Sequence, residues 1–176
     1  ASLIYAQSDE RAALAAVSRN EAEFALVTET AMRYADTRLF KQSLGSTEFK
    51  VAIGQQHRLF KANSKKITPI ETVLEQDFVT PLNPLFVGLE QAASDGWRDD
   101  IFERKIRYRS DDYLLMKHLL DAGLALAYIP DFLLKPLGLH VLTIGGCPYR
   151  CTQEILLVHN PSAASGWMQR MVADIK

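Results

Sequence analysis

Residues 122–130 have the sequence AGLALAYIP, and this stretch decides the predicted fold. Gly123 follows a segment in which Leu115 and Leu119 are spaced for one face of a helix, so we expect it to end that helix. The apolar run after Gly123 stops at Pro130, which is typical of a short strand buried on both faces of a parallel sheet. A helix followed by such a strand indicates an α/β protein.

The alternation of strand and helix extends to both sides of this stretch. The N-terminal part predicts a strand over residues 2–6, a helix that Ser8 caps and Asn20 ends, and a buried strand of the parallel type over residues 23–27. Further predicted strands cover residues 49–53, 77–81, 105–109 and 154–159. Further helices are expected to begin at Thr68-Pro69, at Asn83-Pro84 and at Ser110 or Asp111, and a final helix carries the apolar stripe Trp167, Met168, Met171, Val172 and Ile175.

Length and composition are those of a globular protein. The chain has 176 residues, 48% of them hydrophobic and 23% charged, which excludes disordered, collagen-like and disulfide-scaffold proteins. No apolar run reaches the ~20 residues of a membrane span, and the start lacks the basic residues of a secretion signal. We therefore expect a cytoplasmic protein, or a fragment of one, with no membrane partner. A net charge of −1 gives no basic excess for nucleic acid.

The reactive side chains form no recognisable catalytic or metal motif. Cys147 and Cys151 are the only cysteines, and no histidine pair accompanies them at zinc-ligand spacing. Two unconnected thiols and a redox pair both stay open, the first being the commoner arrangement. The four histidines are scattered, and no Ser/His/Asp order, P-loop or HExxH motif occurs. We expect no catalytic residue, no metal and no cofactor.

Two breaks in the pattern divide the chain. The first is Gly54 with the polar residues after it, and the second is the Gly145-Gly146 pair. The expected parts are residues 1–54 plus 151–176 as one lobe, residues 55–146 as the second lobe and residues 147–150 as a hinge crossover. The predicted fold class is therefore α/β, with two lobes and two crossover segments.

Polar side chains follow the predicted strands or begin the predicted helices, at the sheet edge where α/β proteins collect ligands. These candidate effector-binding residues are Ser8, Thr28, Thr80, Pro81, Asn83 and Ser110. Hydroxyl and amide groups beside helix N-termini suit a small anionic or polar ligand, because unpaired N–H groups favour negative charge. Ordinary helix capping and turn chemistry are the alternative explanation for the same residues.

The order of these segments resembles the effector-binding domain of LysR-type transcriptional regulators over nearly the whole chain. The family's pattern of alanine-glycine-x-glycine, apolar run and proline resembles residues 122–130, with Ala125 at the second glycine. Its isoleucine-threonine, leucine, phenylalanine-valine-x-proline pattern resembles residues 67–81. Its histidine-proline-leucine resembles residues 57–59, with Arg58 at the proline.

The resemblance implies a fold similar to type II periplasmic binding proteins and a sensor rather than an enzyme. It implies a small-molecule effector between the lobes, a homodimer or homotetramer, and DNA binding only through an N-terminal helix-turn-helix domain that this sequence lacks. It also implies that the sequence starts at the family's second effector-domain strand, after a strand-helix unit of on the order of 30 residues. Ser8, Thr28 and Thr80-Pro81 match the positions of the family's ligand-binding loops.

Two alternatives use the same architecture. A solute-binding protein of a transporter also has two lobes, and a secretion signal upstream would favour it. An enzyme on this fold would bring a titratable pair together in the cleft.

Overall fold

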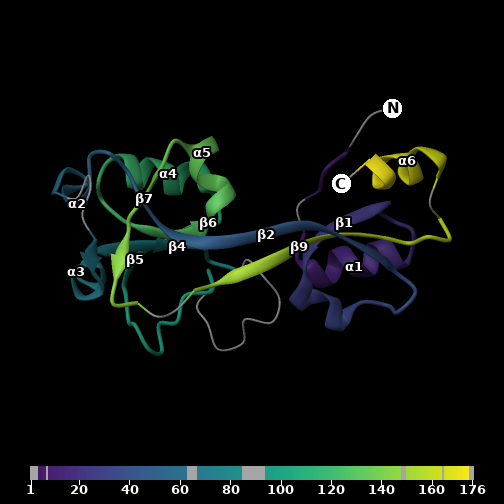
Figure 1. Cartoon of the computed structure of the whole chain (residues 1–176), viewed down its shortest axis with the longest axis horizontal. Helices are drawn as coiled ribbons and strands as arrows, with labels where there is room; N and C mark the ends of the chain where they lie inside the picture. The colour runs from purple at the N-terminus through teal and green to yellow at the C-terminus, as the bar shows by residue number, and fades with distance from the viewer. Residues whose placement is uncertain are drawn as a thin grey trace. The chain divides into compact units, whose positions relative to one another are not determined.

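The computed structural model describes residues 4–6, 8–62, 67–84, 94–147, 150–163 and 165–174. These residues divide into two compact units (Figure 1). Unit 1 contains the described residues up to Ser46 and those from Gln153 onward, and unit 2 contains those from Thr47 to Thr152. Two strands, β2 (Phe40–Ile53) and β9 (Thr152–His159), contribute residues to both units.

Unit 1 is built on an antiparallel sheet. β1 (Phe24–Thr28) pairs with β9 in a register that sets Phe24 opposite His159, and β9 lies between β1 and β2. Along β1 the buried residues alternate with Leu26, which is 57% exposed. Leu26 is the exposed residue of this strand.

Unit 1 also contains helices that pack beside this sheet. They are α1 (Glu10–Ser18), the 3-10 helix η1 (Glu29–Tyr34) and α6 (Gly166–Asp174). α1 begins after Asp9, whose carboxylate accepts a hydrogen bond from the Ala12 N–H at 2.9 Å. The core of the unit consists of Leu14, Val17, Ala25, Val27, Ala31, Leu156 and Val158.

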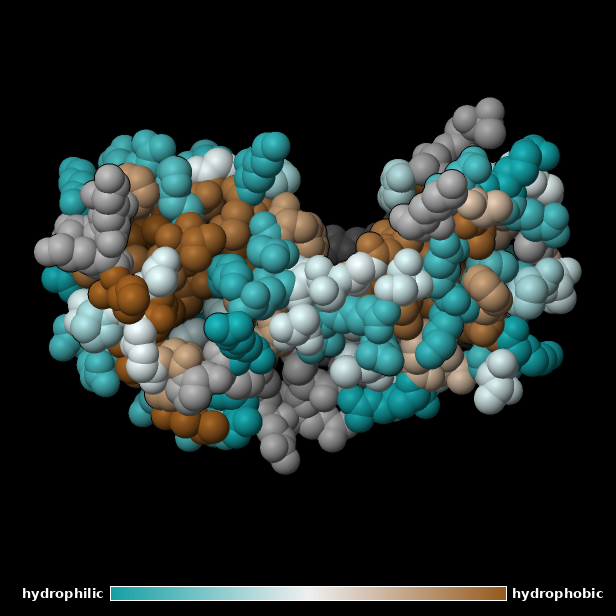
Figure 2. Space-filling model, in the orientation of Figure 1, coloured by the Kyte–Doolittle hydropathy of each residue, from teal (hydrophilic) through white to brown (hydrophobic). Residues whose placement is uncertain are grey.

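Unit 2 contains several short strands around the second half of β2. They are β3 (Thr68–Pro69), β4 (Asp77–Thr80), β5 (Lys105–Arg109), β6 (Ala127–Pro130), β7 (His140–Val141) and β8 (Ile144–Gly145). β4 and β5 run parallel, as do β3 and β8, and Leu126 adds a parallel bridge to Phe78 in β4. β6 and β7 pair antiparallel with β2. Figure 2 shows apolar surface in the region of β7, the strand that carries the partly exposed Val141.

The helices of unit 2 pack on these strands. They are α2 (Arg58–Ala62), α3 (Ile70–Leu74), α4 (Tyr113–Asp121), the 3-10 turn η2 (Asp131–Leu133) and α5 (Leu134–Leu137). The core consists of Ala52, Val79, Met116, Leu120, Ala125, Ala127, Ile129 and Leu139. At Gly54 an added Cβ would lie 2.1 Å from the Leu120 carbonyl oxygen, so the end of β2 can approach α4 only with glycine there.

A buried ion cluster anchors the segment before β5. Arg104 donates to both Asp95 oxygens at 2.8 and 3.0 Å and to both Asp99 oxygens at 2.8 and 2.9 Å. The Arg104 and Asp95 side chains are 0% exposed, and the guanidinium lies 5.2 and 5.1 Å from the ring centroids of Phe78 and Trp97. Burial acts to lower the pKa of Arg104, but its hydrogen bonds to Asp99 and Asp95 outweigh burial and raise it.

Several predicted elements are confirmed. The strands expected over residues 77–81, 105–109 and 154–159 are β4, β5 and β9, and the final helix is α6. Met168 is the buried residue of the described part of α6, so most of the expected apolar stripe does not reach the core. The helix expected from Asn83 falls largely on residues 85–93, which lie outside the described residues.

The predicted helix caps are wrong by one or two positions. Asp9, not Ser8, caps α1, because its carboxylate reaches the N–H groups of the first turn. Asp112, not Ser110 or Asp111, caps α4 for the same reason.

Other local predictions also fail. Thr68 lies in β3, and Pro69 takes the cap position of α3. The strand expected as parallel over residues 23–27 is the antiparallel β1, because its partner is β9. Residues 4–6 of the expected first strand are in no strand. The run after Gly123 becomes a strand only from Ala127 onward.

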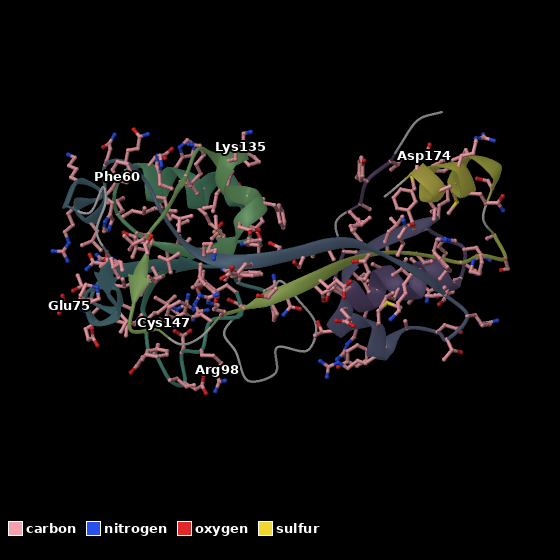
Figure 3. All side chains as sticks on the ribbon, in the orientation of Figure 1. Phe60, Glu75, Arg98, Lys135, Cys147 and Asp174 are labelled. Carbon is pink, nitrogen blue, oxygen red and sulfur yellow. The ribbon has the colours of Figure 1, made fainter. Side chains whose placement is uncertain are left out.

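We predict that Arg104→Met destabilises the chain by roughly 3–5 kcal/mol, because it leaves the Asp95 carboxylate buried without its cation. Urea unfolding at neutral pH measures this change. Arg98→Met is the matched control, because Arg98 (Figure 3) pairs with the half-exposed Asp100 and such pairs contribute about 1 kcal/mol or less. Equal losses in the two variants would contradict the structural role of the cluster.

Candidate functional site

Unit 1 gathers polar groups where β1 ends and η1 begins. Thr28 is the last residue of β1 and the cap position of η1, and Glu10 is the first residue of α1. The Glu10 Oε1 atom accepts from the Thr28 N–H at 2.5 Å and from the Thr28 hydroxyl at 2.7 Å. Both side chains are buried, and Glu10 is only 8% exposed. A carboxylate of the chain itself thus occupies the donors of Thr28.

Two further polar side chains extend this group. The Thr30 and Thr28 hydroxyl oxygens lie 2.9 Å apart, and the Gln153 Oε1 atom is 3.5 Å from the Thr30 hydroxyl. The single hydroxyl proton of Thr28 goes to Glu10, so the single proton of Thr30 lies between two acceptors, the Thr28 hydroxyl oxygen and Gln153 Oε1. The result is a connected polar cluster of Glu10, Thr28, Thr30 and Gln153, drawn from α1, β1, η1 and β9.

Unit 2 gathers polar groups at the carboxyl ends of the parallel strands β4 and β5. The Ser110 N–H donates to the Thr80 carbonyl at 2.9 Å, which fixes the two strand ends side by side. The Ser110 hydroxyl oxygen accepts from the Asp112 N–H at 3.0 Å. The Thr80 hydroxyl is completely buried and has no hydrogen-bond partner among the described residues. A buried hydroxyl without a partner costs free energy, which makes Thr80 the unusual residue of this group.

Asp111 closes the loop that follows β4. Its carboxylate accepts from the Leu82 N–H at 2.9 Å, from the Asn83 N–H at 3.1 Å and from the Asn83 side-chain amide at 2.6 Å. The hydrogen bonds from Asn83 and Leu82 hold the pKa of Asp111 below its ordinary value. The loop N–H groups expected to meet an anionic ligand are therefore held by an anion of the protein.

Tyr113 lies in the first turn of α4, half-buried against the core that contains Val79 and Met116. Burial, followed by the negative charges of Asp111 and Asp95, raises the pKa of its phenol to about 12. A phenol is protonated at neutral pH at either value, and the raised pKa keeps the Tyr113 hydroxyl a hydrogen-bond donor into the alkaline range.

The six sequence-predicted site residues fall into two groups. Thr80, Pro81, Asn83 and Ser110 come together in unit 2, where the Pro81 carbonyl accepts from the Ser94 hydroxyl at 2.6 Å. Ser8 and Thr28 belong to unit 1. The expectation that Ser8, Thr28, Thr80 and Ser110 border one cleft between the lobes concerns both units and stays a prediction.

Sequence reasoning missed Glu10, Thr30, Gln153 and Tyr113. Glu10 had a usable signal, because it lies four and seven residues before Leu14 and Val17 and so shares their apolar helix face. A carboxylate on such a face needs a buried donor. Gln153 had no such signal, because its hydrogen-bond partner Thr30 is distant in the sequence.

The remaining candidates add no chemistry to these two groups. Within the described residues, no three His, Cys, Asp or Glu side chains are placed to hold a metal ion. The sulfurs of Cys147, on the loop between β8 and β9 (Figure 3), and Cys151 are not bonded to each other. None of the helices in the described part of the chain has the length and hydropathy of a membrane span.

Two α/β units that share two crossing strands define a two-lobed ligand-binding domain, and comparison with known proteins assigns the family. The model of the LysR substrate binding domain matches residues 3–174. The chain belongs to this family, whose fold is similar to type II periplasmic binding proteins. This confirms the predicted family and fold class. No curated protein matches significantly.

Solved structures support the same fold. The CcmR regulatory domain of Synechocystis PCC6803 in complex with 2-PG has a TM-score of 0.67 and 14% identity, over 96% of this chain and 78% of that one. The C-terminal domain of a probable LysR family regulator from Rhodococcus sp. RHA1 has a TM-score of 0.66 and 15% identity, over 96% and 81%. A regulatory domain of OxyR2 from Vibrio vulnificus has a TM-score of 0.61 and 18% identity, over 96% and 77%.

We predict that the phenol of Tyr113 stays protonated at pH 10.5, because its pKa is about 12 rather than 10. The difference in ultraviolet absorbance between the wild-type chain and Tyr113→Phe measures this during an alkaline titration. Because the folded pKa is the higher one, the associated stability is complete below pH 10 and is lost as the pH rises through 12. Asp111→Asn should lower the Tyr113 pKa, whereas a Tyr113 signal that titrates at pH 10 would contradict the assignment.

Proposed function

We propose that this chain senses a small polar effector and that the hydroxyl of Thr80 binds it. The chain is a LysR-type effector domain, and such domains serve regulators rather than catalysts. The proposal adds the chemistry of the ligand and the residues that recognise it. Four of the sequence-predicted residues surround the proposed unit 2 subsite, namely Thr80, Pro81, Asn83 and Ser110.

The single observation that carries the proposal is the buried hydroxyl of Thr80. It lies at the end of β4, beside the end of β5, where parallel strands present their ligand-binding edge. A buried hydroxyl without a partner is a cost that folding alone does not require, since valine has the same shape. A ligand that hydrogen-bonds to this hydroxyl removes the cost, so the hydroxyl contributes to the affinity for that ligand.

The carboxylates beside each strand end favour a polar ligand over an anionic one. Asp111 already accepts from the loop N–H groups of Leu82 and Asn83, and Glu10 already accepts from the N–H and the hydroxyl of Thr28. The protonated phenol of Tyr113 and the hydroxyl of Ser110 add neutral hydrogen-bonding groups in unit 2. Alcohols, amides and amines can hydrogen-bond to such a set without the repulsion that a second anion would meet.

In the complete regulator, the effector would act by shifting populations. A ligand that binds one arrangement of the domain better shifts the equilibrium toward it, and contacts in a homodimer or homotetramer would pass the shift to an N-terminal helix-turn-helix domain that binds DNA. Exposed apolar side chains such as Leu114, Leu124 and Phe132 support such an assembly. We place this activity in the cytoplasm, where DNA is accessible.

The family match favours this function over the two alternatives on the same architecture. A transporter's solute-binding protein and an enzyme can have the same two-lobed architecture, but no feature of the described residues favours either function.

The test separates stability from binding. A library of small alcohols, amides, amines and carboxylates is screened by thermal unfolding of the wild-type chain, and the best compound is titrated by calorimetry. We predict that Thr80→Val weakens binding about tenfold, the loss of one neutral hydrogen bond, while it leaves the ligand-free chain equally stable or up to about 1–3 kcal/mol more stable.

Thr143→Val is the matched control, because Thr143 is an exposed threonine of the same unit. It should change neither binding nor stability. Unchanged affinity in Thr80→Val would contradict the proposed role, as would a loss of stability, which would mean that the hydroxyl already has a partner.

A further inference from the structure

We propose that the polar cluster of Glu10, Thr28, Thr30 and Gln153 is a unit 1 subsite and that Glu10 determines its specificity, because its carboxylate fills the position of an anionic ligand on Thr28. The residue thereby excludes carboxylate and phosphate groups from Thr28 and selects a hydroxyl- or ammonium-bearing group instead. The inference rests on the proposed function for its biological meaning, because it concerns the chemistry of the effector. Its physical content is independent of any effector.

The geometry is that of a bound anion. One oxygen of Glu10 accepts two hydrogen bonds, from the N–H and the hydroxyl of Thr28, at 2.5 and 2.7 Å. An oxyanion that used Thr28 would need the same two donors. Each of these donors carries one proton, so Thr28 cannot donate the same two hydrogen bonds to Glu10 and to a ligand anion at once.

The position of Glu10 on α1 makes this contact a fixed feature of unit 1. Leu14 and Val17, on the same helix face, are core residues, so the face that carries Glu10 is held against β1 and β9. Asp9 caps the helix and leaves Glu10 in the first turn, where negative charge is favourable. The packing of the helix thus places the Glu10 carboxylate next to Thr28.

The surrounding cluster extends the selection to the ligand's other groups. Thr30 and Gln153 follow Thr28 in the polar cluster and offer hydroxyl and amide groups. None of these side chains carries a positive charge, so they supply no cation that would offset a second anion. A ligand group that donates a hydrogen bond is favoured beside the Glu10 carboxylate.

The neighbouring Glu29 provides an internal comparison. It follows Thr28 directly and also carries a carboxylate, but its side chain is exposed. Removal of either glutamate changes the net charge of the chain by the same amount. Only removal of Glu10 opens the donors of Thr28.

Chemical rescue by acetate tests the inference on the full chain. Glu10→Ala removes the carboxylate and leaves a space that acetate matches in shape and charge. We expect Glu10→Ala to unfold at a lower temperature than wild type in chloride. Acetate at about ten times its dissociation constant should raise that temperature by roughly 3–6 °C relative to chloride at equal ionic strength.

Three protein controls and one salt control define the outcome. Wild type, Glu10→Gln and Glu29→Ala should show no acetate-specific shift, because in each of them the donors of Thr28 stay covered. Methylammonium chloride should not rescue Glu10→Ala. If Glu10→Ala is unfolded in chloride, the readout becomes the fraction refolded in acetate by circular dichroism, and acetate-dependent refolding supports the inference.

An acetate response of Glu10→Ala no larger than that of wild type, or an equal response of Glu29→Ala, would overturn the inference. Because this experiment uses no effector, its failure is distinct from a failure of effector binding at Thr80. A positive result would direct the search for effectors toward ligands that place an alcohol or amine group at this subsite.

Discussion

The fourteen-residue strand β2 is the constraint on which the rest of the structure depends, because it has to pair its backbone in both units. In unit 1 its partner is β9, and in unit 2 its partners are β6 and β7. The unit 2 register sets Val51 opposite Tyr128, which brings the buried run after Gly123 into the core. Gly54 then ends the strand where α4 approaches most closely. The candidate group of unit 1 lies beside this sheet, because β1 pairs with β9, the neighbour of β2.

The two units satisfy the same physical requirement in the same way. Each has a loop at a strand end whose N–H groups would otherwise lack acceptors, and each supplies a carboxylate from a neighbouring helix start, Glu10 in unit 1 and Asp111 in unit 2. The difference lies in the hydroxyls. Thr28 is fully hydrogen-bonded within the chain, whereas Thr80 is buried without a partner among the described residues. The buried hydroxyl of Thr80 is the reason for placing the proposed effector subsite in unit 2.

Sequence reasoning recovered what short-range patterns encode. Glycine, an apolar run and proline at residues 122–130 predict the helix-strand unit, and alternation predicts β5, because both signals are local. The direction of β1 was wrong because an apolar run does not reveal whether its partner is parallel, and that partner is β9, near the other end of the chain. The helix caps failed where adjacent residues could all cap, as in the Ser110, Asp111 and Asp112 series. Thr80 was chosen for its place at a strand end, whereas the missing partner of its hydroxyl is a property of packing that the sequence does not show.

Hydrogen exchange with and without the best ligand from a screen tests the central claim most directly, because it reports on every backbone amide at once. The account predicts slower exchange in the peptides that contain Thr80 and Ser110, at the ends of β4 and β5. Protection confined to other peptides, with these two unchanged, would contradict it.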